Sequence, residues 1–405
     1  MKSMSENSRR NIIVICGFLL MFFIFATSIS CMGIYLKPVS ESFGISRTQF
    51  SLTTTIGSVA MMISAIIAGR LVGKIKIKVS MAAGILMSAA SMMIYSVADS
   101  INVFYFAAIL MGTAVSFTCN MPISVLINEW FADGKSGTAL GIAFVGSGAG
   151  AMVLNPLYSY IIETYGWRIS FRAAALCVII LLVPILLFVK EKGLPEDEKR
   201  SVIRNDNRLS LSDVIKIPAM WCVFAGFILI SLANMAVLNH GVPYMTDNGV
   251  DAVKAASFIS MGSAALIIGK IVLGRMIDRL GIYKATVFGA IMMLVCILSM
   301  WMTGIAGNGA VIGFVIGYGL GAGVATVSMP GVITYMFGNC DFGSIMGLFC
   351  TTGGIGGILQ IFISMVYDKT GNYNIAWIAV SVIATVTILL YAFMLKPQRK
   401  KTLTN

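Results

Sequence analysis

The chain has 405 residues, of which 58% are hydrophobic and only 11% are charged, and its mean hydropathy is +0.90. A soluble globular protein of this length carries far more charge, so the composition excludes that class and indicates an integral membrane protein. The formal net charge of +12 does not indicate nucleic-acid binding, because the cations form short clusters between long apolar runs, which is the pattern that sets membrane topology.

The apolar runs are continuous and do not alternate with polar residues, which predicts membrane-spanning α-helices and argues against a β-barrel. Each run has about 20 residues or more, enough to cross roughly 30 Å of hydrocarbon. Three cations, Lys2, Arg9 and Arg10, precede the first run and no small-residue cleavage site follows it, so we expect a retained first helix. The twelve predicted helices cover residues 11–36, 48–70, 78–98, 101–129, 136–163, 169–190, 216–243, 253–276, 282–303, 306–336, 343–367 and 373–395.

The distribution of lysine and arginine predicts the orientation of these helices. The two tails and the loops near residues 70–78, 135, 190–216 and 275–284 carry 22 of the 29 cations, and these segments all lie on one side of the predicted membrane. Because cytoplasmic loops carry the excess of lysine and arginine, we expect both termini in the cytoplasm.

One long polar stretch, residues 191–215, divides the chain into residues 1–190 and 216–405, with six predicted helices each. The two halves repeat short motifs at a period of about 205 residues, as internal repeats do. We therefore expect an all-α integral membrane protein whose twelve transmembrane helices form two six-helix pseudo-repeats around a central cavity. The matched motifs are Gly69-Arg70-Leu71 with Gly274-Arg275-Met276, Met121-Pro122 with Met329-Pro330, Gly141 with Gly347, and Gly166 with Gly371.

The loop after the eighth predicted helix carries the most specific motif, Gly274-Arg275-Met276-Ile277-Asp278-Arg279-Leu280-Gly281. It resembles the short cytoplasmic loop of the major facilitator superfamily, a large family of secondary transporters. The resemblance implies a gating loop, in which the glycines allow a tight turn and Asp278 caps a helix or pairs with an arginine. The alternative is an ordinary basic loop. The first-half counterpart keeps Gly69 and Arg70 but has Gly73 and Lys76 in place of the acid and the second glycine.

The fifth predicted helix carries small residues at a spacing that lets helices pack to near backbone contact. The array is similar to the fifth-helix signature of the monocarboxylate transporters, with Trp130 where they more often carry tyrosine. The first-helix acidic and aromatic signature of the animal members is missing, so the chain resembles the bacterial branch that also includes oxalate:formate antiporters. Generic helix packing is the alternative. The small residues are Ala139, Gly141, Ala143, Gly146, Ser147 and Gly150, with Gly347 in the eleventh helix.

Lys270 is a cation inside an apolar run, which costs roughly 2.5–3.5 kcal/mol on insertion scales and is a functional-site hypothesis by default. It matches the carboxylate-binding arginine of the resembling transporters, and Lys37 matches their first-helix lysine. Gly353 stands where oxalate carriers have a second intramembrane lysine, so a monoanion is favoured over a dianion. Leu266 stands where the animal carriers have an aspartate, so the proton route is unassigned. The alternatives are a Lys270 side chain that reaches the cytoplasmic interface and a Lys37 that anchors at the outer one.

Two further polar residues are candidate substrate-binding residues. His240, the single histidine, lies near the outer end of the seventh predicted helix, where it could titrate near neutrality and couple protons to transport. Asn120, in the fourth, could face the cavity. Ordinary hydrogen bonding, to the backbone for His240 and between helices for Asn120, is the alternative for each.

No enzyme motif appears: the sequence lacks HExxH, a P-loop, GxSxG and any cluster of histidines with carboxylates. The eight cysteines are scattered and have no CxxC pair, so we expect free thiols and no metal or cofactor. Without a nucleotide site, transport must use an ion or solute gradient.

The sequence thus predicts a non-enzymatic transporter of a small monocarboxylate, such as lactate, pyruvate or formate, by proton symport or anion exchange. Its partners would be the organic anion, protons in the symport case and the lipid bilayer of a bacterial inner membrane, with no nucleic acid and a monomer as functional unit. Efflux of amphipathic or neutral molecules is the rival, favoured by 27 methionines and 23 phenylalanines. A transporter-like solute sensor is a third reading.

Overall fold

The computed structural model describes residues 6–45, 47–71, 74–131, 135–191, 211–250, 252–306, 310–338, 341–359 and 361–395. Within these ranges the regular elements are helices, and 12 helical segments of 18 to 30 residues are long and apolar enough to span a membrane. The predicted all-α membrane class with twelve spans is confirmed.

The chain forms two compact units, each described here by itself. The first unit contains Met1–Leu211 and Cys340–Gly354, and the second contains Ser212–Asn339 and Ile355–Asn405. The helix α17 (Phe342–Leu359) therefore contributes its first part to one unit and its last part to the other. The division at residues 191–215 into two six-helix bundles stays a prediction.

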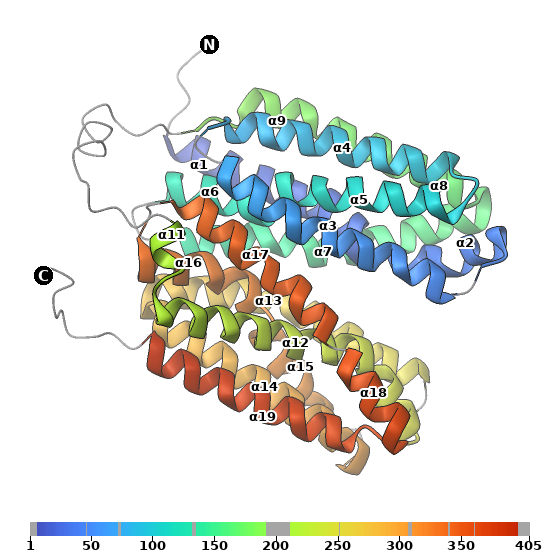
Figure 1. Ribbon diagram of the computed structural model, residues 1–405, viewed down its shortest axis with the longest axis vertical. Helices are drawn as coiled ribbons and strands as arrows, with labels where there is room; N and C mark the ends of the chain where they lie inside the picture. The colour runs from blue at the N-terminus through green and yellow to red at the C-terminus, as the bar shows by residue number, and fades with distance from the viewer. Residues whose placement is uncertain are drawn as a thin grey trace, which may run out of the picture. The chain divides into compact units, whose positions relative to one another are not determined.

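In the first unit, α5 packs against both α3 and α4 (Figure 1). The segment η1 continues α1 without a break and has the wider π-helical hydrogen-bond pattern. The elements of this unit are α1 (Glu6–Leu20), η1 (Met21–Ser30), η2 (Met32–Tyr35), α2 (Leu36–Phe43), α3 (Arg47–Leu71), α4 (Ile77–Val97), α5 (Ile101–Thr118), α6 (Asn120–Trp130), α7 (Ser136–Tyr165), α8 (Trp167–Ile180) and α9 (Leu182–Phe188).

In the second unit, α19 packs against α12 and α14 (Figure 1). The short α11 (Leu211–Val214) precedes α12 across the boundary of the units. The remaining elements are α12 (Pro218–Asp247), α13 (Ala252–Leu280), α14 (Ile282–Ala306), α15 (Val311–Gly321), η4 (Val324–Ser328), α16 (Met329–Phe337), α18 (Ile361–Thr370) and α19 (Asn374–Met394).

Glycines allow the helices to cross at backbone contact. A Cβ atom on Gly146 of α7 would lie 2.2 Å from the Phe18 carbonyl oxygen of α1, and one on Gly150 would lie 2.2 Å from that of Phe22 in η1. In the second unit, a Cβ atom on Gly269 of α13 would lie 1.8 Å from a carbonyl oxygen of α15. No side chain fits at these crossings, so glycine sets the distance between the helix axes.

Three predicted helices are interrupted where a proline follows. Proline has no N–H group, so it leaves the carbonyl four residues earlier without its helical donor. The α5–α6 helix breaks at Cys119, before Pro122, and the α8–α9 helix turns at Leu181, before Pro184. The α15–η4–α16 helix becomes irregular from residue 322 to 328, before Pro330. The uninterrupted apolar runs predict one continuous helix in each case, so this prediction is corrected at the three prolines.

One pair of repeat positions, Gly166 and Gly371, takes the same backbone conformation in both halves of the sequence. Gly166 ends α7 with a φ of 85°, and Gly371 ends α18 with a φ of 70°. Each glycine N–H donates to the carbonyl four residues back, on Ile162 and Tyr367. Positive φ is costly for residues with a Cβ atom, so this conformation explains glycine at both positions.

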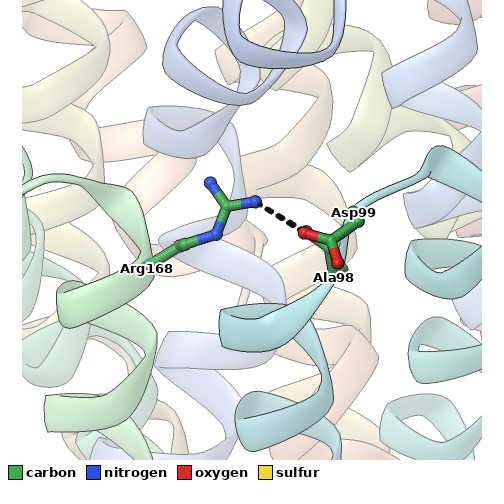
Figure 2. Close-up of polar contacts among 3 residues, drawn as sticks. All are labelled: Ala98, Asp99 and Arg168. Carbon is green, nitrogen blue, oxygen red and sulfur yellow. Dashed lines mark hydrogen bonds and ion pairs between the residues drawn. The ribbon is translucent and has the colours of Figure 1, made fainter.

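Arg168, in the first turn of α8, joins this helix to the turn between α4 and α5 in the first unit (Figure 2). Its guanidinium donates to the Ala98 carbonyl at 2.9 Å and contacts an Asp99 carboxylate oxygen at 3.3 Å. It also lies 4.1 Å from the centroid of the Trp167 ring. A cation at the last carbonyls of α4 stabilises that helix end, and Arg168 thereby fixes α8 to the α4–α5 turn.

Candidate functional site

Lys270 lies inside the membrane-spanning part of α13 and is only 6% exposed. Its side chain packs against Gly323, directly before η4: a Cβ atom on Gly323 would lie 3.5 Å from Lys270 Cγ and 3.8 Å from its Cα. Little of the residue is exposed, and its stem lies beside the point where α15 loses its α-helical pattern.

The contact between α13 and α15 is close along its length because three small residues meet there. Gly269, next to Lys270 in the sequence, meets the backbone of Gly319, and a Cβ atom on Gly319 would lie 2.8 Å from that of Ala265. This crossing holds the Lys270 backbone rigidly against the tenth span. A close crossing positions the Cα atom of Lys270, from which a flexible four-carbon stem carries the charge.

The residues before the two Met-Pro motifs share a property that the sequence analysis did not identify. Asn120 precedes Met121-Pro122 and Ser328 precedes Met329-Pro330, so they occupy equivalent positions of the repeat. The buried Asn120 Oδ1 and Ser328 Oγ atoms accept or donate no hydrogen bond within the described part of the chain. Several other buried side-chain atoms of the described residues share this property, and such atoms are expected to find a partner in water or a ligand. Repetition of the Met-Pro motif was the signal that could have led to Ser328.

Two hydroxyl pairs, also absent from the sequence analysis, join the first span to its neighbours. Thr27 Oγ1 lies 3.2 Å from the Tyr158 hydroxyl of α7, and the Tyr35 hydroxyl lies 2.8 Å from Ser170 Oγ of α8. The Tyr35 ring also stacks on Phe171 with the centroids 4.0 Å apart. These bonds hold the π-helical η1 and the 3₁₀ turn η2, and irregular segments inside spans are common at functional sites.

His240 lies in α12, is 9% exposed and belongs to an aromatic cluster. Its ring centroid is 5.8 Å from that of Tyr373, which stacks on Tyr367 at 4.3 Å. Tyr244, one turn further along α12, donates to the Trp301 carbonyl at 2.6 Å. The cluster holds the ends of α12, α14 and α18 together around the histidine.

The predicted gating loop forms a tight turn in the second unit. Gly274, Arg275, Asp278 and Arg279 lie in the last two turns of α13, which ends at Leu280, and α14 begins two residues later. Gly281 alone links the helices with a φ of 85°, which accounts for the glycine.

The first-half counterpart is longer. Lys76, at the position of this glycine, has a φ of −58°, and α3 ends at Leu71 whereas α4 begins at Ile77. Gly69 and Arg70 lie in the last turn of α3. In the same unit, Gly347 of α17 lies against this turn, because a Cβ atom on it would be 3.1 Å from Gly69 Cα, and Ser344 Oγ donates to the Gly69 carbonyl at 3.3 Å.

Two further predicted residues, Lys37 and Gly141, lie in α2 and α7 of the first unit. Lys37 lies in α2, and its side chain is outside the described part of the structure. Gly141 is buried in α7, five residues before Gly146. The described residues contain no group of three or more histidine, cysteine or acidic side chains that could hold a metal ion.

The chain is similar in sequence and in fold to known membrane transporters. The Agnestins efflux protein AgnL12 of Paecilomyces divaricatus is 25% identical over 88% of this chain and 80% of its own length. Monocarboxylate transporter 12 of Homo sapiens is 22% identical over 92% of this chain and 78% of its own. The crystal structure of the E. coli fucose:proton symporter FucP superposes with a TM-score of 0.72 at 16% identity, over 97% of this chain and 99% of that one, which shows a shared fold.

The sequence profile described as the Major Facilitator Superfamily matches residues 18–361, a range that contains most of the helical segments and ends before α19. Twelve spans, the repeated Met-Pro and glycine motifs and the tight loop at Gly281 agree with this match. The chain is a multi-pass membrane protein that belongs to the major facilitator superfamily of transporters.

Proposed function

We propose that this protein is a secondary active transporter that moves a small monocarboxylate across the cytoplasmic membrane by alternating access, as a proton symporter or an anion exchanger. The observation that supports the proposal most is Lys270, a lysine of a membrane span that is 6% exposed and packs on the irregular part of the tenth span. Charged residues inside spans are costly and almost always serve a substrate or ion path.

A carboxylate is the ligand that suits this lysine. An ammonium donates charge-assisted hydrogen bonds to carboxylate oxygens, and these are about twice as strong as bonds between neutral groups. One lysine matches one negative charge, so a monoanion is favoured over a dianion. A solute that binds one conformation of the carrier better than the other shifts the equilibrium between them, which is the basis of alternating access.

The irregular segments that each unit carries within its spans support a transport role. In transporters, discontinuous helices expose backbone groups near the middle of the membrane, where they bind solutes and ions. Here η1, the break before Asn120 and η4 are such segments, and Asn120 Oδ1 and Ser328 Oγ are buried atoms that a bound solute or water would satisfy. Asn120 would thereby contribute to substrate binding.

We assign supporting roles to the other predicted residues. His240 would carry a proton in the symport case, since an imidazole changes its charge near neutral pH. Lys37 would attract the anion at the outer side. Gly274, Arg275, Asp278, Arg279 and Gly281, with Gly69 and Arg70, would form the loops that latch the closed state.

Uptake into proteoliposomes tests the proposal. Labelled lactate, pyruvate, formate and oxalate are offered with an inward proton gradient or with anion loaded inside. For Lys270→Ala we expect uptake of the monoanions to fall about 10- to 100-fold, because a lost charge-assisted bond costs about 1.5–3 kcal/mol. Lys270→Arg should keep part of the activity, and Lys216→Ala, at an exposed lysine, should keep all of it. Unchanged uptake in Lys270→Ala would remove this lysine from the mechanism.

Efflux of amphipathic or neutral molecules is the second candidate. The relative named as an agnestins efflux protein favours it, as do the many methionine and phenylalanine side chains that could line a tolerant cavity. A buried cation opposes it, because it repels cationic compounds. Transport of a neutral or cationic dye that is equal in wild type and Lys270→Ala, without carboxylate uptake, would favour efflux.

A further inference from the structure

A small cavity opens on the side of the first unit, where α3 ends, α4 begins and the fourth span breaks. Its volume is about 90 Å³. The wall is apolar except for Ser80, and includes Leu71, Ile75, Val79 and Pro122. The Ser80 hydroxyl donates to the Phe117 carbonyl at 3.1 Å, which is a carbonyl freed by the break, so this group is already satisfied. An apolar cavity with no polar group to offer does not hold ordered water and suits hydrocarbon.

The mouth of the cavity faces the surroundings of the protein. Ile75 is 41% exposed and Val79 is 53% exposed, and both belong to the wall. On α4 the exposed apolar stripe continues from Val79 through Ala83 to Leu86, at helical spacing. In a membrane span an exposed apolar stripe contacts acyl chains, so the cavity opens toward lipid.

Four cations, Arg70, Lys74, Lys76 and Lys78, belong to the segment that forms one side of the cavity wall. Each is adjacent in sequence to a residue of the cavity wall, namely residues 71, 75, 77 or 79. Arg70, Lys74 and Lys76 are exposed, and none of the four forms an ion pair with another described residue. Glu191, the acid beside them, is occupied, because its carboxylate accepts the Ile77 N–H at the start of α4.

We propose that this cavity and its four cations bind one anionic phospholipid, with part of an acyl chain in the cavity and the phosphate on the Lys74 and Lys76 side chains. The charges are complementary, since the segment lies on the side where the cation count predicts the anionic cytoplasmic leaflet, and lysines there attract anionic lipid. The corresponding loop of the second unit keeps the acid Asp278 and links its helices through Gly281 alone. The longer connection with four cations is therefore a feature of the first unit.

Native mass spectrometry of the purified full chain with added lipid tests the proposal. We expect the wild-type protein to retain one phosphatidylglycerol in preference to phosphatidylcholine. The variant Lys74→Gln/Lys76→Gln should lose about 30-fold in phosphatidylglycerol affinity, from the usual contribution of two lysines near an anionic headgroup. The matched control Lys135→Gln/Lys216→Gln removes two exposed cations elsewhere and should keep wild-type affinity. Equal losses in both double variants would overturn the proposal, because net charge alone would then explain binding.

The acyl chain is tested separately. Ala83→Phe fills the cavity from its exposed wall and should weaken phosphatidylglycerol retention while the lysines remain. Glycerol phosphate and inorganic phosphate, at the same concentration as the lipid, should not displace it. Displacement by either, or full retention in Ala83→Phe, would mean that the loop binds a free anion and the cavity plays no part.

Discussion

At the scale of single residues, the glycines are the positions from which the structure is most directly predicted. Gly146, Gly150 and Gly269 meet carbonyl oxygens of neighbouring helices, and Gly281 takes a left-handed conformation that ends α13. The small-residue spacing and the loop motif predicted close packing and a tight turn. They did not predict which helix each glycine faces, because that depends on helix rotation, which the spacing leaves open.

Two adjacent glycines of α17 test this interpretation in the second unit. A Cβ atom on Gly356 would lie 2.7 Å from the Leu232 backbone nitrogen of α12, whereas one on Gly357 would have no atom within 4 Å. We expect Gly356→Ala to destabilise the protein by about 1–3 kcal/mol through overpacking, and Gly357→Ala to be neutral or to stabilise it by about 0.5–1 kcal/mol. Thermal unfolding in detergent measures both. Equal effects of the two substitutions would contradict the close crossing of α12 and α17.

At the scale of elements, the sequence predicted where the spans lie better than how they are built. Hydropathy is insensitive to a change in hydrogen-bond pattern within a span, so the π-helical η1, which contains no proline, carried no signal. The repeated Met-Pro pair predicted equivalent positions, and the structure adds that both follow an irregular segment. Ser328 was missed because a serine in an apolar run is usually satisfied by its own helix.

The hydroxyl bond between Tyr35 and Ser170 tests how the irregular first span is held. Tyr35→Phe removes a 2.8 Å bond between η2 and α8 and keeps the ring that stacks on Phe171. We expect a coupling energy with Ser170→Ala of about 0.6 kcal/mol, and at most about 1.7 kcal/mol, as found for such bonds in membrane proteins. A double-mutant cycle on detergent-solubilised protein measures it, with the exposed Tyr160→Phe as a control. Additive single effects would mean that the bond does not contribute.

At the scale of the whole molecule, composition and run length were sufficient for the class, because twelve apolar segments of this length have few other stable arrangements than membrane helices. One intramembrane lysine in α13 was sufficient to nominate a site for an anion. The shape of a solute site depends on side chains from many spans at once, and hydropathy and motif spacing contain no record of their mutual positions. For the same reason, the motifs predict the family and do not predict the solute.

The central claim is that Lys270 recognises the negative charge of the solute. Equilibrium binding of a labelled monocarboxylate to the purified protein, in competition with unlabelled lactate or its neutral amide, measures this directly. In wild type, lactate should compete at least about 10-fold better than lactamide, because the amide lacks the charge-assisted bond. In Lys270→Gln this preference should disappear. A preference for the acid that persists in Lys270→Gln, or equal competition by the amide in wild type, would contradict the account.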